Sequence, residues 1–526
     1  MDAPLIHLPE DLAVAHAMIR DLLKALQERN RDVETLRQQV ERLKRYLYGR
    51  KSEKGNSEPI LFAYAGLLEA LEQAEEAVAK EAGSDESVPD AEVSTSPAKR
   101  MNGKRLQVRA DLPVERVEYP LPEASCVCGN CGGQLERFGE EITRQLDYHP
   151  ASFHIREHVR IKYACPKCRQ TVVTGERPSQ PIEKGLPGPG MLANVLTSKY
   201  CDHLPLYRQE QMYARHGIHV SRKTLCDWVQ ACGRVLEPVY EWMKKEVLLS
   251  AILGTDDTPV SVQDKGRKKL RQGRLWVYRG DGEHPYVVYD YTPNRCRDGP
   301  ERFLRGYRGY LQADAYAGYD ALYASKKIIE VGCMAHARRK FFDAQSSSAA
   351  LAHIALAYIG RLYEVEQEAK VYEEENGLID QARAAYRCAI RQEKSRPLLD
   401  KFHEWLCEQK DTVLPKSPMG EAIDYALGQW AALTRYLEDG RLDIDNNAVE
   451  RELRPIAVGR KNYLFLGSDQ GGRSAAIIYS LIRTCKRHGI EPFGYLRDVL
   501  DRIADHPITR IEELTPLAWK QAHTAA

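Results

Sequence analysis

The stretches that decide the fold are LSAILGTDD, at residues 249–257, and GYLQADAY, at residues 309–316. In both, apolar residues typical of a buried β-strand lead to aspartates. Further elements are predicted between and after these two stretches. Strands are expected at residues 273–280, 286–293 and 328–336, and helices at residues 299–305 and 319–325.

Three strands followed by helix, strand, helix and strand is the order of an RNase H-like fold. In that architecture an acid at the end of the first strand lies beside an acid on the fourth strand. Asp256 and Asp314 fill these two positions. A third acid is expected from a later helix, and Glu450 begins such a helix within residues 443–465.

Three clustered carboxylates suit the hydrolysis or transfer of phosphodiesters. Two divalent ions, roughly 3.5–4 Å apart, can activate the nucleophile and stabilise the leaving oxygen. Mg²⁺ prefers oxygen ligands, and Mn²⁺ can substitute for it. Asp256 and Asp257 should point to opposite faces of their strand, so we do not expect both to bind metal.

Each acid also has a purely structural interpretation. Glu450 lies three residues after Asn447, which is the spacing of a helix capping box. Asp256 could end a strand in a solvated turn, and Asp314 could belong to a turn before Gly318. The residues alone leave both interpretations open.

A long helical stretch separates the second acid from the third. Residues 315–449, 135 in number, lie between Asp314 and Glu450, far more than one helix and one strand require. Residues 349–437 are helical in pattern, so an all-helical insertion is expected to split the catalytic domain. Cys333 and His336 have the spacing of a metal knuckle, but we interpret them as part of a core strand that leads into a helix.

Two CxxC pairs indicate a structural zinc site upstream. The first pair is Cys128 and Cys131, the second is Cys165 and Cys168, and 33 residues lie between the two pairs. Alternating residues between the pairs predict strands, so the segment is typical of a zinc ribbon that holds one Zn²⁺. Cys126 is an alternative ligand.

A helix-turn-helix is expected next. Residues 206–215 and 222–236 have helical patterns, and the turn between them contains Gly217. Ser221 is placed to cap the second helix, which opens with Arg222 and Lys223. A helical hairpin without any role in DNA binding would have the same pattern.

The N-terminal region has a different pattern. Apolar residues recur at steps of three and four from Ile19 to Leu47, which predicts a coiled coil and a homo-oligomer that is at least a dimer. A single helix packed on its own chain is the alternative. Residues 51–105 are expected to form a second helix followed by a disordered linker.

The overall composition favours a cytoplasmic protein that associates with the nucleoid when it is bound to DNA. No apolar run is long enough to cross a membrane, and no signal peptide is evident. The net charge of +1 conceals several basic clusters. The residues expected to contact DNA are Arg222, Lys223, Lys265, Arg267, Lys268, Lys269, Arg338, Arg451, Arg454, Arg460 and Lys461.

Long stretches of the chain resemble the insertion sequence 66 family of DDE transposases from end to end. They include LKRYLYGRKSEK, KYACPKC, TDDTPV, LQADAYAGYD, GCMAHARRKFFDA and IDNNAVERELRPIAVGRKNYLFLGSDQGG. The resemblance implies that Asp256, Asp314 and Glu450 are the catalytic acids, in that order. It also implies binding to terminal inverted repeats and target DNA, and small accessory proteins from the same element.

The sequence departs from the family pattern at two positions. Asp257 stands where the family usually has glutamate, and Ala315 stands where glycine is usual. Neither departure removes a metal ligand. The alternatives to an active transposase are a decayed protein that only binds repeat DNA and a non-mobile nuclease of RNase H-like fold.

The expected organisation is therefore a multidomain chain of the α+β and α/β classes. A coiled coil (residues 1–50), a helix with its linker (51–105), a zinc ribbon (106–185) and a helix-turn-helix (186–244) precede the catalytic domain. That domain has two parts (245–345 and 438–482) around the helical insertion (346–437), and a helical tail (483–526) follows.

Overall fold

The computed structural model describes residues 152–164, 172–174, 179–183, 185–264 and 269–524. Every helix and strand among them lies in one compact unit, which includes Arg160–Ala526. The expected coiled coil and linker lie outside the described residues. So do several residues with an expected role, namely Cys128, Cys131, Cys165, Cys168, Lys265, Arg267 and Lys268.

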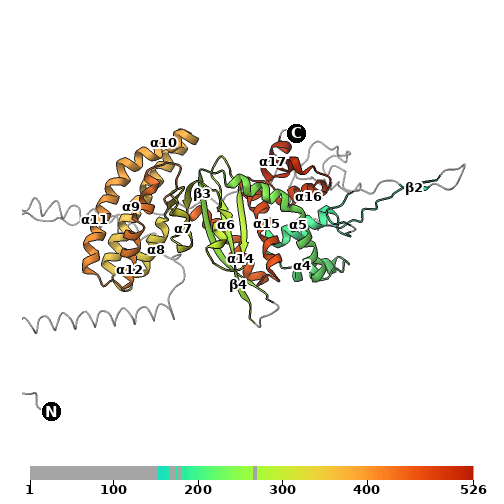
Figure 1. Ribbon diagram of the computed structural model, residues 1–526, viewed down its shortest axis with the longest axis horizontal. Coiled ribbons are helices and arrows are strands. Elements are labelled where there is room, and N and C mark those ends of the chain that lie inside the picture. Colours follow the sequence, from blue (N-terminus) through green and yellow to red (C-terminus); the bar gives the residue numbers. More distant parts are fainter. Residues whose placement is uncertain (1–151, 165–171, 175–178, 184, 265–268, 525–526) are drawn as a thin grey trace, which may run out of the picture. The chain divides into compact units, whose positions relative to one another are not determined.

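A five-stranded mixed sheet forms the centre of this unit (Figure 1). Its order is β5-β4-β3-β6-β7; the first three are antiparallel neighbours, and β3, β6 and β7 run parallel. The order of elements along the chain is the one expected from the sequence. The strands are β3 (Ile252–Val262), β4 (Arg271–Arg279), β5 (Val287–Thr292), β6 (Gly309–Gln312) and β7 (Ile328–Val331).

The strand boundaries correct two expectations. β3 was expected to end at Asp257, but it continues to Val262 because β4 pairs with it from Gly254–Arg279 to Val262–Arg271. β7 ends at Val331, so Cys333 and His336 lie beyond the strand; Cys333 is the N-cap of α8 (Met334–Ala344).

The two faces of β3 meet different helices. On one face α14 (Asn447–Tyr463) comes so close that a Cβ built on Gly254 would lie 2.4 Å from Val449. On the other face the Thr255 hydroxyl lies 3.3 Å from the Tyr319 hydroxyl, next to α7 (Asp320–Tyr323). α6 (Asp298–Phe303) packs near Tyr319. Alternation along β3 therefore directs Gly254 and Asp256 toward α14, and Thr255 and Asp257 away from it.

The edge strand β5 is covered by α15 (Asp469–Arg487). The β5 backbone N–H groups of Val287 and Tyr289 donate to the hydroxyls of Thr484 and Ser480, at 3.1 and 2.8 Å. Side-chain hydroxyls thus replace the strand that is missing at this edge, which prevents pairing with another chain.

The segment before the sheet is helical. α3 (Pro189–Tyr200) and α4 (Leu206–Arg215) precede the long α5 (Arg222–Val247). Gly217 has the left-handed φ of +75° that the turn needs, and the Ser221 hydroxyl accepts the Thr224 N–H, as the sequence predicts. α5 does not end at Leu236 as expected, because an apolar stripe keeps it packed against the core as far as Val247. This stripe includes Leu236, Val239, Met243 and Val247.

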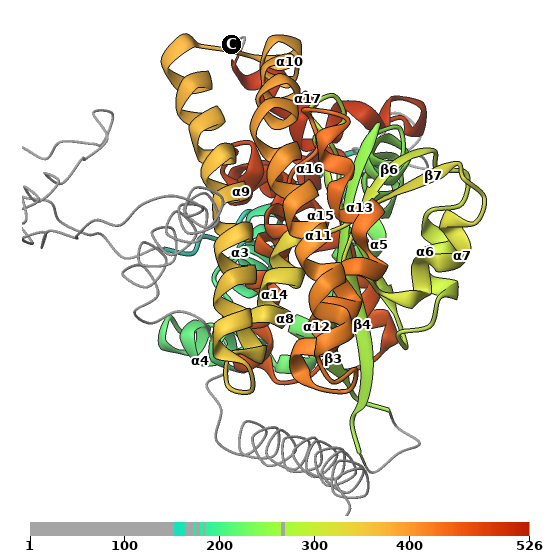
Figure 2. The ribbon, with the colours of Figure 1, turned by 90° about the vertical axis from the view of Figure 1, so that its left-hand side faces the viewer.

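Helices dominate residues 349–437, as the sequence predicts. They gather beside β7 and α8, and α9 and α11 run side by side (Figure 2). Backbone hydrogen bonds from Gly332 to Ala432 (2.9 Å) and from Met334 to Ile444 (3.1 Å) join the segment that precedes these helices to the segment that ends them. The elements are α9 (Ala349–Asn376), α10 (Asp380–Ile390), a π-helical turn (Arg391–Ser395), α11 (Arg396–Thr412), α12 (Pro418–Gly428) and α13 (Trp430–Thr434).

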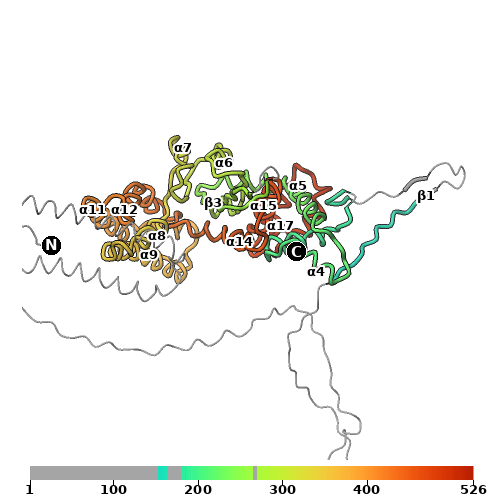
Figure 3. Tube along the Cα trace, turned by 90° about the horizontal axis from the view of Figure 1, so that it is seen from below, coloured from blue at the N-terminus to red at the C-terminus, as the bar shows by residue number. Residues whose placement is uncertain are grey.

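The C-terminal segment adds α16 (Pro492–Arg502) and α17 (Pro516–Thr524), which both contact α15. Figure 3 shows α17 close to α15 and α5. α16 packs on α3, so distant parts of the chain share one core. Upstream, β1 (Lys162–Ala164) and β2 (Val172–Thr174) form an antiparallel pair, and the second CxxC lies in the segment that joins them. Among the described residues, no helix is long and apolar enough to span a bilayer.

Candidate active site

Asp256 and Asp314 lie level with each other at one end of the parallel strands. Gly254 on β3 pairs with Gln312, the last residue of β6, and each aspartate follows two residues later on its own chain segment. The carboxyl ends of parallel strands are where α/β folds commonly place their ligands. The register therefore brings together the two acids that the sequence singled out.

Glu450 lies at the same end of the parallel strands because hydrogen bonds hold the start of α14 there. Asn446, which is buried, donates from its side chain to the Thr255 carbonyl at 2.9 Å and from its backbone to Cys333 Sγ at 3.1 Å. The Gln312 side chain donates to the carbonyls of Asp443 and Asp445. Gly254 completes the anchoring because its missing Cβ leaves room for α14.

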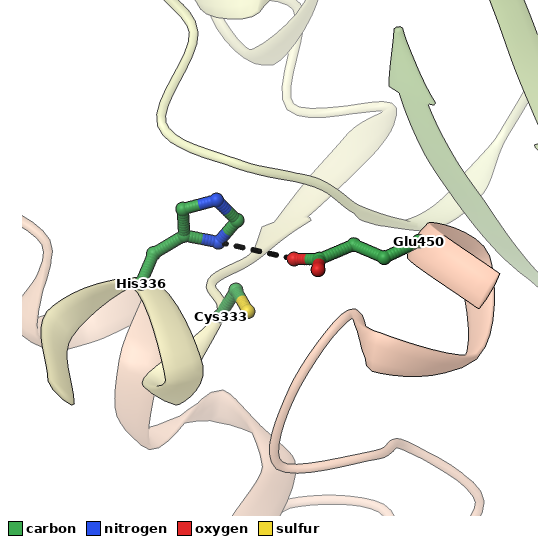
Figure 4. Close-up of side chains that lie close together, drawn as sticks. All are labelled: Cys333, His336 and Glu450. Carbon is green, nitrogen blue, oxygen red and sulfur yellow. Dashed lines mark ion pairs between the residues drawn. The ribbon is translucent and has the colours of Figure 1, made fainter. Parts of the chain in front are cut away.

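The capping-box interpretation of Glu450 finds no support in these contacts. Asn446 is the N-cap residue, and its side chain makes no capping hydrogen bond. The carboxylate of Asp445 instead accepts the Asn447 N–H at 3.0 Å and the Tyr363 hydroxyl at 2.8 Å. Asp445 thus serves the start of the helix, while Glu450 extends toward α8 (Figure 4).

Burial and neighbouring acids dominate the electrostatics of Asp256. Burial raises the pKa of Asp256 to about 7, and the negative charges of Asp314, Asp257 and Glu450 act in the same direction. The hydrogen bond from the Asp257 N–H only partly offsets this rise. Burial also raises the pKa of Asp314. A cation bound among these oxygens would relieve both burial and repulsion.

Asp257 has a very different environment from its neighbour. Its side chain is only 2% exposed and pairs with Arg274 at 2.9 Å and with Arg295 at 2.8 Å. Arg295 also lies 3.6 Å from the Asp314 carboxylate and stacks on the Tyr316 ring. Sequence reasoning missed these arginines, because their distance along the chain gives no sign of the pairing.

His336 is a second group that sequence reasoning did not assign to the site. It lies in the first turn of α8, with its Nδ1 atom 3.9 Å from Glu450 Oε1 (Figure 4). A positive charge on His336 also lowers the pKa of Asp314. The signal that could have found it is the position of its CxxH directly after a parallel strand of the same sheet.

Comparison with known proteins identifies the family. The model described as "Transposase IS66 family" matches residues 184–474, more than half of the chain. This chain belongs to the IS66 transposase family. Three further models of the family's segments match: "IS66 C-terminal element" (480–517), "zinc-finger binding domain of transposase IS66" (125–169) and "Transposase C of IS166 homeodomain" (35–117).

Relatives in Sinorhizobium fredii (strain NBRC 101917 / NGR234) match along nearly their whole length. "Uncharacterized protein y4hP" is 36% identical over 92% of this chain and 89% of its own length. "Uncharacterized protein y4qI" is 33% identical over 97% of this chain and 93% of its own. Their names assign no activity, so the family models carry the functional information. They indicate a transposase with DNA-binding and zinc-finger domains.

The basic residues expected at DNA are spread over several elements of this IS66 transposase. Arg222 and Lys223 are exposed at the start of α5, and Arg222 pairs with Glu210 at 3.4 Å. Lys269 is exposed beside the β3–β4 hairpin. Arg338 on α8 is half-buried, whereas Arg451, Arg454 and Lys461 on α14 are exposed.

Arg460 has a structural partner that the sequence did not suggest. Its guanidinium donates to the Thr258 hydroxyl at 2.9 Å and to the Pro259 carbonyl at 2.7 Å. These bonds fasten α14 to β3. Arg460 is therefore already engaged in holding the site together, unlike the exposed cations of the same helix.

Proposed function

We propose that this protein is an active DDE transposase whose Asp256, Asp314 and Glu450 hold two Mg²⁺ ions in an RNase H-like domain. The observation that carries the proposal is the convergence of these acids beside the carboxyl end of β6, where its parallel pairing with β3 stops. The strand order, with three antiparallel strands followed by two parallel ones, supports the RNase H-like assignment.

The chemistry follows from the residues that the site offers. The two ions would activate water or a 3′-hydroxyl and stabilise the leaving oxygen of the phosphodiester. Asp256 and Asp314, on neighbouring strands, would orient the ions, and Glu450 would close the site from α14. Gly254, which has no side chain, and Asn446, which is hydrogen-bonded to Thr255, fix the distance between α14 and β3. Cleavage at the terminal inverted repeats would then be followed by strand transfer into target DNA.

Isosteric variants test the catalytic assignment. Asp256→Asn, Asp314→Asn and Glu450→Gln should each abolish end cleavage and strand transfer on DNA that carries the element's own ends. DNA binding should survive, because side-chain volume is unchanged. Asp298→Asn, an exposed acid in the first turn of α6, is the matched control and should retain full activity. Normal cleavage by Glu450→Gln would remove that residue from the proposal.

Product analysis separates the transposase from a non-mobile nuclease. A transposase should join cleaved 3′-ends to a second DNA, whereas a nuclease should release ends and join none. A decayed protein would bind repeat DNA and give neither product. Combining two of the three acid variants should add little to either one, because residues that act as one unit are not additive.

We further propose that Cys128, Cys131, Cys165 and Cys168 bind one structural Zn²⁺. All four cysteines fall within the zinc-finger match at residues 125–169. Elemental analysis should find about one tightly bound zinc per chain. Cys165→Ser should lose it and weaken specific binding to the ends, since structural zinc contributes directly to folding. Protein purified without chelators that contains no zinc would contradict this assignment.

DNA contacts are proposed to divide between recognition and general attraction. Replacing Arg222 on α5 should relax sequence preference. Neutralising Lys265, Arg267, Lys268 and Lys269 together should weaken binding to every sequence and flatten its salt dependence. Loss of specific binding alone in the loop variant would reverse these roles. Light scattering after deletion of residues 1–50 tests whether the N-terminal helix holds protomers together.

A further inference from the structure

The Nδ1 atom of His336 is buried and has no hydrogen-bond partner among the described residues. It lies 3.9 Å from Glu450 Oε1. The dashed line in Figure 4 marks this pair. A direct N–H···O bond spans about 2.7–3.2 Å, so the two atoms are too far apart to satisfy each other. Something between them would have to satisfy this nitrogen.

A metal ion fits that separation. Metal–nitrogen and metal–oxygen bonds to transition ions are both about 2.1 Å long, so one ion can lie between the two atoms and reach each with small side-chain adjustments. His336 comes from the first turn of α8 and Glu450 from the first turn of α14. Because Asn446 anchors α14 to both β3 and Cys333, the backbone already holds these two helix starts together.

Cys333 is the third potential ligand, since one ligand atom from each of Cys333, His336 and Glu450 lies within 4.8 Å of the others. Its sulfur, however, accepts the Asn446 N–H at 3.1 Å, and the residue is only 1% exposed. A hydrated ion would have to displace this bond and enter the core. Cys333 therefore anchors the start of α14, and the accessible pair is His336 with Glu450.

We propose that His336 is a nitrogen ligand of the ion that Glu450 holds. The metal site is then asymmetric: Asp256 and Asp314 offer only oxygen, whereas the position between α8 and α14 offers nitrogen and oxygen. Imidazole suits first-row transition ions and carboxylates suit Mg²⁺, so the second position favours Mn²⁺ over Mg²⁺. This inference rests on the proposed metal-dependent function and adds a ligand and an ion preference to it.

Pulsed electron paramagnetic resonance of Mn²⁺ bound to the full-length protein tests the ligand directly. The Mn²⁺ signal should be modulated by a coupled ¹⁴N nucleus, and growth on ¹⁵N-histidine should replace that coupling with one from ¹⁵N. His336→Gln should lose the coupling. His523→Gln, which alters an exposed histidine on α17, should keep it.

Binding measurements supply the second test. His336→Gln should weaken Mn²⁺ binding by at least about tenfold, in line with the loss seen when partners of metal ligands are removed, and should change Mg²⁺ binding much less. If Mn²⁺ binding depends on Asp256 but the resonance spectrum shows no coupling to a histidine nitrogen, this inference is overturned and the proposed function stays intact. Mn²⁺ binding that is unaffected by Asp256→Asn and Glu450→Gln would overturn the metal site itself.

Discussion

Two regions of this molecule treat buried acids in opposite ways. In the helical insertion, Glu366 forms two 2.7 Å hydrogen bonds with Arg391, whose side chain is 1% exposed. Glu373, only 6% exposed, forms two bonds with Arg387. At the sheet edge, Asp256 is largely buried among other acids, and its pKa rises to about 7.

The difference shows which buried carboxylates serve the fold. A buried acid that only stabilises structure needs a paired, hydrogen-bonded cation, because an isolated charge is costly to bury. Glu366 and Glu373 meet that requirement with arginines in two-bond geometry. Asp256 does not, and its unfavourable environment is what a cation site would exploit. Asp257, one residue away, belongs with the paired acids.

The largest stability effect is expected from breaking a pair in the insertion. Arg391→Ala should lower the free energy of unfolding by about 3–5 kcal/mol, because Glu366 would remain as an unpaired, mostly buried charge. The loss would include the bond from Arg391 to the Tyr436 carbonyl at 2.8 Å. Denaturant titration measures it. The double variant Arg391→Met with Glu366→Leu should recover most of the loss, and failure to recover would mean that the arginine acts through its other contacts.

Asp257→Asn should have the next largest effect. Removing its charge weakens the pairs with Arg274 and Arg295, which are 23% and 37% exposed, so we expect a loss of about 1–3 kcal/mol. Asp256→Asn should not be destabilising. If the two variants lose equal stability in the same denaturant titration, the contrast between these neighbours is wrong.

The pH dependence of stability should distinguish Asp256 from the paired acids. Its pKa is higher in the folded protein, about 7, than its ordinary value of 3.8, so the folded state binds the proton more tightly. The stabilisation contributed by Asp256 is therefore greatest at low pH and is lost as pH rises from about 4 to about 7. Without divalent ions, the melting temperature of Asp256→Asn should increasingly exceed that of the unaltered protein across this range. A constant difference would contradict the raised pKa.

The smallest effect is expected at the surface of the insertion. Lys394 and Glu368 form an ion pair there, but their side chains are 41% and 51% exposed. Solvent screens such pairs, so Lys394→Ala should leave the unfolding free energy nearly unchanged. A loss similar to that of Arg391→Ala would show that burial does not separate the two pairs.

Sequence reasoning succeeded where the signal is local. The turn at Gly217 and the cap at Ser221 depend on neighbouring residues, so their positions could be predicted. The order of the strands followed from hydrophobic patterns in the same way. The family resemblance pointed to Glu450, which is separated from Asp314 by 135 residues and which spacing alone could not have paired with it.

Contacts that only tertiary packing creates were not predictable. Arg295 follows β5 and Arg274 lies on β4, yet both reach Asp257. His336 was assigned to a core strand that leads into a helix, whereas β7 ends at Val331 and His336 already lies in the first turn of α8. β3 was expected to end at Asp257 because acids often mark turns, but pairing with β4 carries it on to Val262.

The hydrogen bonds from Gly332 to Ala432 and from Met334 to Ile444 have an evolutionary consequence. The chain leaves the sheet after β7 and returns to it at the same place. The number of residues in the helical insertion therefore does not affect the position of Glu450. Lengthening a surface turn within it, such as that at Gly377, costs little because loop-closure entropy grows slowly with length. Selection can therefore remodel the outer end of the helical insertion while the candidate active site keeps its geometry.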